Sequence, residues 1–185
     1  MAVLRLLAVG EPVSSPAAAG AAGMADQRAE QVLRSWPTVF WDDDERVTGL
    51  WGLALDEMPH RIRRTGTDLS TWCAWDPLFL ARVIGDLQVA TADPVTGEAI
   101  TYRVGADGSV TGASHPAAVL SFRRPDQPWG DDAVTTFCNY VLHFTGPATA
   151  QRWTAAHPGT FVLSLADAVE LARRHAARVF GAGLA

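Results

Sequence analysis

Apolar residues in the first part of the chain recur at helical spacing and then give way to two short extended runs. Three short helices are predicted, over residues 3–9, 17–22 and 26–36. In the third helix Ala29, Val32 and Leu33 share one face, and Asp26 is expected to cap its start. Two strands that flank an acidic turn follow, over residues 39–41 and 47–55. Helices followed by a hairpin are typical of a winged helix, so we predict a winged-helix-like module over residues 1–58.

The rest of the chain, residues 59–185, alternates short strands with turns and a few helices. Strands are predicted over residues 60–64, 87–92, 99–104, 114–122, 139–144 and 161–163. Helices are predicted over residues 77–84, 149–157 and 165–180. Short turns join most of the strands, which indicates an α+β core with a mainly antiparallel sheet and flanking helices.

Three less regular segments complete this prediction. Residues 69–85 have a mostly helical pattern, which we divide at Pro77 because proline favours the first turn of a helix, with Asp76 as the N-cap. Residues 125–130 are expected to form a loop, and residues 131–138 a helical or irregular segment.

Composition and charge narrow the class of protein. The chain has 185 residues, 48% of them hydrophobic and 19% charged, which is typical of a globular protein. The sequence contains no run of about 18 apolar residues, so no membrane span is predicted. The apolar start is broken at Gly10-Glu11-Pro12, too early for a secretory signal, so we expect a cytoplasmic protein without a membrane partner.

Binding to nucleic acid is an alternative that the winged-helix pattern raises. Gln27, Arg28, Gln31 and Arg34 on the third helix would suit a DNA groove. The wing, however, carries the four carboxylates of residues 42–45, and phosphates would repel them. The net charge of -5 also gives no basic footprint. We therefore expect no nucleic-acid partner and keep a metal-responsive regulator as a rival hypothesis.

The chain has two cysteines, Cys73 and Cys138, too few for a disulfide framework. Isolated cysteines are usually small buried apolar residues. Cys73, however, precedes Asp76 by three positions at the start of a predicted helix, where a thiolate and an ionised carboxylate would both be stabilised. A carboxylate within reach of a thiol can take its proton and deliver it elsewhere. The spacing alone favours ordinary helix capping over this catalytic role.

Cys138 is either a buried strand cysteine or a second soft ligand. Two thiolates and a carboxylate do not make a structural zinc site, whereas two thiolates suit a soft cation that prefers linear coordination. The five histidines show no metal-ligand spacing. A cysteine–histidine dyad of a hydrolase, with His143 or His115 as the base, stays open.

A family resemblance separates these alternatives. Residues 69–80, LSTWCAWDPLFL, resemble the W-C-A-x-D-x-L motif of organomercurial (alkylmercury) lyases. Phe137-Cys138, followed by Thr149-Ala150 and Trp153, is similar to the second cysteine segment of that family. Residues 47–55, VTGLWGLAL, resemble its G-x-G-L-x-L hairpin, and the preceding helices resemble its winged-helix-like module. The resemblance covers most of the chain.

The resemblance implies protonolysis of carbon–mercury bonds, giving a hydrocarbon and Hg(II). It assigns catalysis to Cys73, Asp76 and Cys138, which would also hold the mercury, and places the aromatic residues Trp72 and Phe137 in the substrate pocket. No cofactor is implied beyond an external low-molecular-weight thiol that removes the product. The resemblance also implies a mercuric reductase as a partner that accepts the product. The chain departs from the family at Asn139, where well-known members carry an extra cysteine, and at Pro77. The first helix of the family's winged-helix-like module is also expected to be missing. A paralogue that binds a soft metal without turnover is the second rival.

Overall fold

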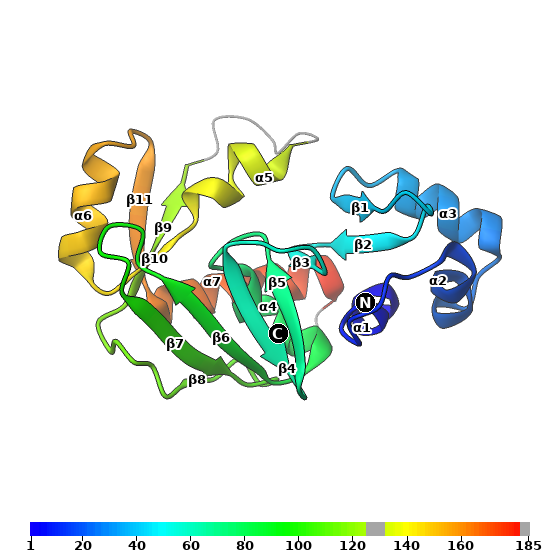
Figure 1. Cartoon of the computed structure of the whole chain (residues 1–185), viewed down its shortest axis with the longest axis horizontal. Coiled ribbons are helices and arrows are strands. Elements are labelled where there is room, and N and C mark those ends of the chain that lie inside the picture. The colour runs from blue at the N-terminus through cyan, green and yellow to red at the C-terminus, as the bar shows by residue number, and fades with distance from the viewer. Residues whose placement is uncertain (125–131, 182–185) are drawn as a thin grey trace.

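Two antiparallel sheets and a set of helices build the fold (Figure 1). The computed structural model describes residues 1–124 and 132–181. The larger sheet has eight strands in the order β1-β2-β3-β5-β4-β6-β7-β8, and the smaller has three in the order β10-β9-β11. In the described residues all paired strands of both sheets run antiparallel, so the predicted α+β class with an antiparallel sheet is confirmed.

The element bounds are as follows. The strands of the larger sheet are β1 Val39–Trp41, β2 Val47–Leu50, β3 Leu53–Ala54, β4 His60–Arg64, β5 Thr67–Thr71, β6 Leu87–Ala92, β7 Ala99–Val104 and β8 Val110–Thr111. Those of the smaller sheet are β9 Val119–Arg123, β10 His143–Phe144 and β11 Thr160–Ser164. The helices are α1 Ala2–Leu7, α2 Ser15–Ala22, α3 Asp26–Arg34, α4 Asp76–Ile84, α5 Ala133–Thr136, α6 Pro147–Ala155 and α7 Leu165–Phe180, with a 3-10 turn η1 at Cys138–Tyr140.

The N-terminal segment joins the larger sheet. Figure 1 shows α1 to α3 and the β1–β2 hairpin gathered at one end of the molecule. β3 pairs with β5, so the larger sheet contains strands from both sides of the predicted module boundary at residue 58. Leu4 and Leu7 of α1 are fully buried in the main core, and the Arg5 side chain donates to the Val83 carbonyl oxygen at 3.2 Å. These contacts anchor α1 to α4; the winged-helix character of the module stays a prediction.

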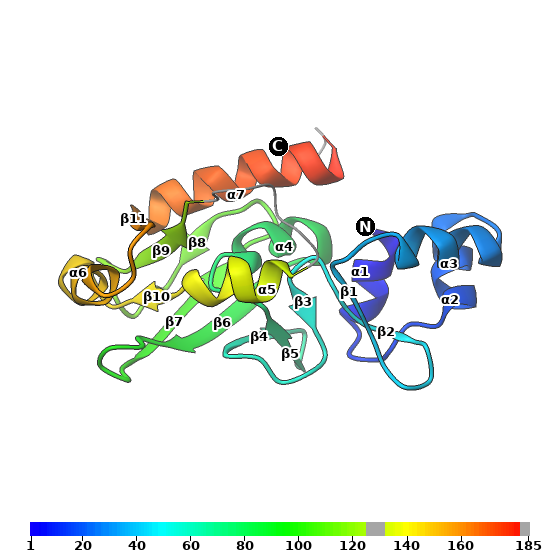
Figure 2. The same ribbon diagram turned by 90° about the horizontal axis from the view of Figure 1, so that it is seen from above.

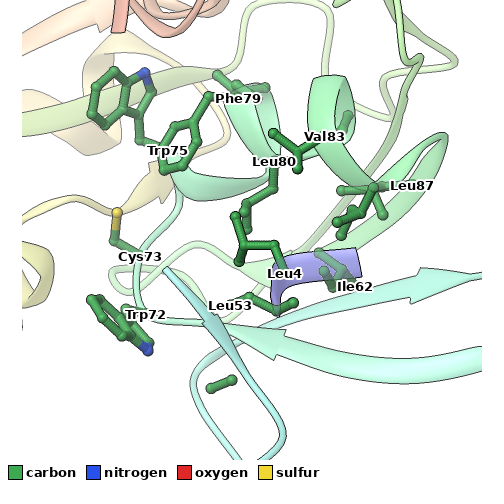
Figure 3. Packing of buried hydrophobic residues seen from close by; sticks show 14 of the residues in the cluster. Leu4, Leu53, Ile62, Trp72, Cys73, Trp75, Phe79, Leu80, Val83 and Leu87 are labelled. Carbon is green, nitrogen blue, oxygen red and sulfur yellow. The ribbon is translucent and has the colours of Figure 1, made fainter. Parts of the chain in front are cut away.

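α4 packs against β6 and β7 of the larger sheet, and α7 lies outside α4, against α4 and strands β9 and β11 of the smaller sheet (Figure 2). Strands β6 and β7 alternate buried and exposed residues, as expected for a sheet with one face in the core. Side chains from α1, α4 and the central strands meet in this core, among them Leu4, Leu53, Ile62, Leu80 and Leu87 (Figure 3). Figure 3 also shows Trp72, Cys73 and Trp75 at the edge of the same packing. The site predicted from the sequence is therefore built on the main core.

Several predicted bounds are wrong for identifiable reasons. Residues 69–71 form the end of strand β5 rather than a helix, because this segment pairs with both β3 and β4. Ser14 caps α2 and Ala25 precedes α3, so Asp26 lies inside its helix rather than capping it. Residues 47–55 divide into β2 and β3 around a two-residue turn, and β8 was not predicted. The strand predicted over residues 114–122 begins only at Val119, and that over 139–144 is shortened by η1.

Other segments agree closely with expectation. The predicted strands over 39–41, 60–64, 87–92 and 99–104 and the helix over 165–180 match their observed bounds. The loop predicted over residues 125–130 lies outside the described residues. In the described part of the chain, no helix has the length and apolar character needed to cross a bilayer.

Candidate active site

Cys73 lies in a short loop that links the end of β5 to the start of α4. The Trp72 backbone N–H donates to the Gly52 carbonyl oxygen at 2.9 Å, and the Thr71 hydroxyl donates to the Cys73 carbonyl oxygen at 3.1 Å. These bonds satisfy backbone groups that would otherwise be buried without partners. The loop is thereby fixed between the sheet and the helix, and residue Cys73 is only 1% exposed.

The Asp76 carboxyl turns back toward Cys73. One oxygen, Oδ2, accepts the Cys73 backbone N–H at 2.7 Å, and the other, Oδ1, accepts the Cys73 thiol at 3.2 Å. Asp76 is the first residue of α4, and its N-cap is Trp75, which makes no side-chain capping bond. The predicted N-cap role of Asp76 is therefore wrong. Its carboxyl accepts hydrogen bonds from Cys73 instead of capping the helix.

Burial sets the protonation of this pair. It raises the pKa of Asp76 to about 7, although hydrogen bonds from Cys73 act in the opposite direction. Burial also raises the pKa of Cys73 well above its ordinary value, assisted by a hydrogen bond with Cys138 and by the charge of Asp76. The expected stabilisation of both ionised forms by the helix start is thus outweighed by desolvation. At neutral pH the thiol holds its proton beside a carboxyl that is poised to accept one.

Cys138 reaches the same place from a distant part of the chain. It begins η1 rather than lying in a strand. The Ser121 hydroxyl donates to the Tyr140 carbonyl oxygen at 2.7 Å, and the Ala74 N–H donates to the Val141 carbonyl oxygen at 3.0 Å. These bonds tie the turn to β9 and to the Cys73 loop, and they bring the two thiols within hydrogen-bonding reach. The structure therefore brings Cys73, Asp76 and Cys138 together.

A second carboxyl, that of Asp93, has the opposite pKa shift because its hydrogen bonds outweigh a desolvation that is weaker than that of Asp76. The Asp93 side chain is fully buried. Burial raises its pKa, but hydrogen bonds from Thr145, Val95 and Thr149 outweigh that effect and the net pKa is lowered. Asp93 is therefore a structural anion that fixes turns, whereas Asp76, with fewer strong donors, remains able to exchange a proton.

Gly52 allows the Asp76 carboxyl to occupy its position, and sequence reasoning missed this residue. It has φ +89°, and a Cβ built on it would lie 2.5 Å from Asp76 Cγ and 2.7 Å from Asp76 Oδ1. Any larger residue would displace the carboxyl and strain the backbone. The Trp51-Gly52 pair between two apolar runs was the sequence signal of this turn.

A small apolar cavity of about 50 Å³ adjoins the site. Asp76 and Cys138 line it, and so do Trp72 and Phe137, the two aromatic residues predicted for the pocket. Cys73 lies outside its lining. The sequence did not indicate four further residues of the wall, namely Trp51, Trp75, Phe79 and His175. His175 comes from α7, and nothing near it in the sequence marked it out.

The structure argues against a cysteine–histidine dyad. His143 is fully buried, its Nε2 lies 2.9 Å from the Tyr102 hydroxyl, and burial together with the neighbouring His60 lowers its pKa to about 3. Such an imidazole is a weak base. His115 instead pairs with Glu98 at 3.0 Å. Among the described residues, no group of three or more His, Cys, Asp or Glu side chains is arranged to hold a metal ion. A soft cation here would rest on the two sulfurs, and coordination by Asp76 stays a prediction.

The buried Asp76 is expected to make stability depend on pH. Its pKa is about 7 when folded against 3.8 ordinarily, so the folded state holds an extra proton between these values. The contribution of Asp76 to the free energy of unfolding should therefore fall as pH rises from about 4 to about 7. Asp76→Asn should abolish this fall, so that the variant gains up to about 4 kcal/mol relative to the parent by pH 8. Urea unfolding between pH 4.5 and 8 measures it, with the exposed Asp43→Asn as control. A difference that is constant over this range would contradict the assignment.

Comparison with known proteins agrees with this geometry. Residues 53–177 match the MerB family of alkylmercury lyases. The chain is 36% identical over 177 residues to an alkylmercury lyase of Staphylococcus epidermidis, covering 95% of this chain and 80% of that one. It is 37% identical over 172 residues to that of Bacillus cereus, covering 92% and 77%.

A solved structure shows the same fold. The crystal structure of the mercury-bound form of MerB2 superposes with a TM-score of 0.72 at 18% identity, covering 92% of this chain and 84% of that one. The family match spans both cysteines and Asp76, and the relatives match nearly the whole chain. The chain therefore belongs to the alkylmercury lyase family.

Proposed function

We propose that this protein is an organomercurial lyase, which cleaves carbon–mercury bonds by protonolysis. In this reaction R–Hg⁺ and a proton give the hydrocarbon RH and Hg²⁺. The observation that carries the proposal is the Cys73 thiol donating to the buried Asp76 carboxyl beside the Cys138 thiol. Membership in the alkylmercury lyase family supports it.

Capture of the substrate begins at Cys138. Cys138 lines the cavity, whereas Cys73 lies behind it and is engaged with Asp76. The Cys138 thiol replaces the thiolate with which the organomercurial arrives: R–Hg–SR′ and Cys138–SH give R–Hg–S–Cys138 and R′SH. The aromatic cavity beside it accommodates the organic group.

Proton transfer then follows the hydrogen bond between Cys73 and Asp76. As the Cys73 sulfur binds mercury, its proton moves to Asp76 Oδ1, 3.2 Å away. The carboxyl can hold this proton near neutral pH because burial has raised its pKa to about 7. Two sulfur ligands push electron density toward the mercury-bound carbon. Protonated Asp76 donates to that carbon, the electron pair of the Hg–C bond forms the new C–H bond, and Hg²⁺ stays on the two thiolates.

Small thiols complete the cycle. Two R′SH molecules convert the bound product to Hg(SR′)₂ and return both cysteines to the thiol form, so no other cofactor is required. A mercuric reductase is the proposed acceptor of the product. The position after Cys138 is the exposed Asn139, and the chain contains no third cysteine. Release of Hg²⁺ therefore depends on external thiols. The free thiols and the need for reduced carrier thiols favour a cytoplasmic location.

The proposed partners do not include nucleic acid or a membrane, and residues 1–58 are proposed to be a winged-helix-like module with a packing role. Arg34, which the sequence suggested for a DNA groove, pairs with Glu30 and Glu45 at 2.9 Å each. Arg46 pairs in the same acidic turn with Asp42 and Asp44. The wing therefore exposes carboxylates, and its arginines are already paired with carboxylates. Such a surface would repel the phosphates of DNA and is typical of a solvent-exposed face.

The test is hydrocarbon release by the purified protein. Phenylmercury or methylmercury is incubated with the protein and excess small thiol, and benzene or methane is measured. Catalytic release over many turnovers is expected. One equivalent of bound mercury without any hydrocarbon would instead identify a binding-only paralogue.

A further inference from the structure

The turn between β2 and β3 holds a tryptophan in a backbone conformation that bulky residues rarely adopt. Leu50 pairs with Leu53, so Trp51 and Gly52 alone form the loop, with φ +50° and +89°. Two positive φ values in a two-residue loop are typical of a type I′ turn, in which Asn-Gly is strongly preferred. Such strain persists only where the surroundings hold it, and it concentrates at functional sites.

Ring contacts with α7 hold the Trp51 indole at the active-site cavity. Its centroid lies 6.2 Å from that of His175 and 6.1 Å from that of Phe180, both on α7. Trp36 contacts it edge-on at 6.5 Å. The indole lines the cavity together with Asp76 and Cys138. The strained turn therefore places an aromatic ring in the wall of the cavity that Asp76 and Cys138 also line.

The cavity has a buried floor and a partly open mouth. Trp75 and Phe79 are 5% and 3% exposed and form the floor, each 4.9 Å from the His175 ring. Trp51 and His175 are only half-buried and form the mouth. The cavity volume of about 50 Å³ is about a third of that of a cavity known to hold benzene. A whole benzene ring needs about 150 Å³, so a phenyl group must extend from the floor into the mouth.

We infer that Trp51, with His175 beside it, is a specificity-determining residue that favours arylmercurials over methylmercury. This inference rests on the proposed lyase function. The mercury-bound carbon must meet the Asp76 carboxyl in order to receive its proton, which places that carbon next to the cavity floor. A methyl group ends there and does not reach Trp51, whereas an aryl ring continues into the mouth. Offset or edge-to-face contact with the indole and imidazole then stabilises the aryl substrate alone.

Trp51→Asn is the test variant, since asparagine is favoured at this position of the turn and the fold should survive. kcat/KM is measured for phenylmercury and methylmercury, each with excess small thiol. The value for phenylmercury should fall about tenfold, while that for methylmercury stays within about threefold. The Tm should stay within about 5 °C of the parent, which shows that the loss is not one of folding.

Trp36→Ala is the matched control. It removes another ring of the same cluster, 40% exposed and outside the cavity lining, and should leave the ratio of the two kcat/KM values unchanged. An unchanged ratio in Trp51→Asn, or an equal fall for both substrates, would overturn the inference while leaving the lyase function standing. Parent protein that releases neither hydrocarbon would overturn the lyase function and this inference with it.

Discussion

Replacing Cys138 with serine is expected to lower hydrocarbon release from phenylmercury or methylmercury by at least about a thousandfold, as is replacing Cys73. A serine hydroxyl is a hard, weakly acidic ligand that does not compete for a soft cation held by small thiols. Without Cys138 the substrate is not captured at the cavity, and without Cys73 there is no proton to pass to Asp76. With two cysteines in the whole chain, no other thiol can substitute for either one.

The control for these variants is Asn139→Ala, an exposed neighbour of Cys138 in η1. It should retain full activity, because its side chain lies outside the lining of the cavity. Circular dichroism of all three variants checks that each is folded. Full activity in Cys138→Ser would refute the mechanism that uses two thiolates.

Gly52→Ala is expected to lower both activity and stability. The added Cβ would meet Asp76 Cγ at 2.5 Å, and alanine at φ +89° is strained in any surroundings. We expect a loss of about 2–4 kcal/mol in the free energy of unfolding. Hydrocarbon release should fall by at least about a hundredfold, because the carboxyl that delivers the proton is moved off the thiol.

Gly66→Ala separates the two causes of that effect. Gly66 has φ +90° but no atom within 4 Å of its would-be Cβ, so this variant has the same backbone strain without the clash. It should lose about 1–2 kcal/mol of stability and keep its activity. Urea unfolding and hydrocarbon release on the two variants measure the difference. Equal activity in both would show that Gly52 does not position Asp76.

Much of the larger sheet could be predicted from the local sequence pattern. Strands β6 and β7 alternate apolar and polar residues and are bounded by clear turns, so their limits matched expectation. The segment around Cys73 could not be predicted in this way. Residues 67–71 are held as a strand by partners on both sides, β3 and β4, and such long-range pairing leaves little trace in a short apolar sequence.

The site itself was predicted from the family motifs rather than from spacing. The spacing of Cys73 and Asp76 alone favoured helix capping, and Cys138 lies 65 positions beyond Cys73 in a turn that no local pattern indicated. The protonation of the site was predicted wrongly, because the helix start was expected to favour ionised groups. Desolvation, which depends on how the whole core closes around Asp76, outweighs that effect. The contributions of Gly52, Trp51 and His175 likewise depend on tertiary contacts.

Asp76→Asn under single-turnover conditions tests the central claim most directly. Parent and variant are each loaded with one equivalent of phenylmercury, and both the mercury retained and the benzene released are counted per protein. The parent should release one benzene for each mercury that it binds. The variant should bind the mercury through its two thiols but release benzene at least about a hundredfold more slowly, because no carboxyl can pass the Cys73 proton to carbon. Benzene release at the parent's rate by Asp76→Asn would contradict the account.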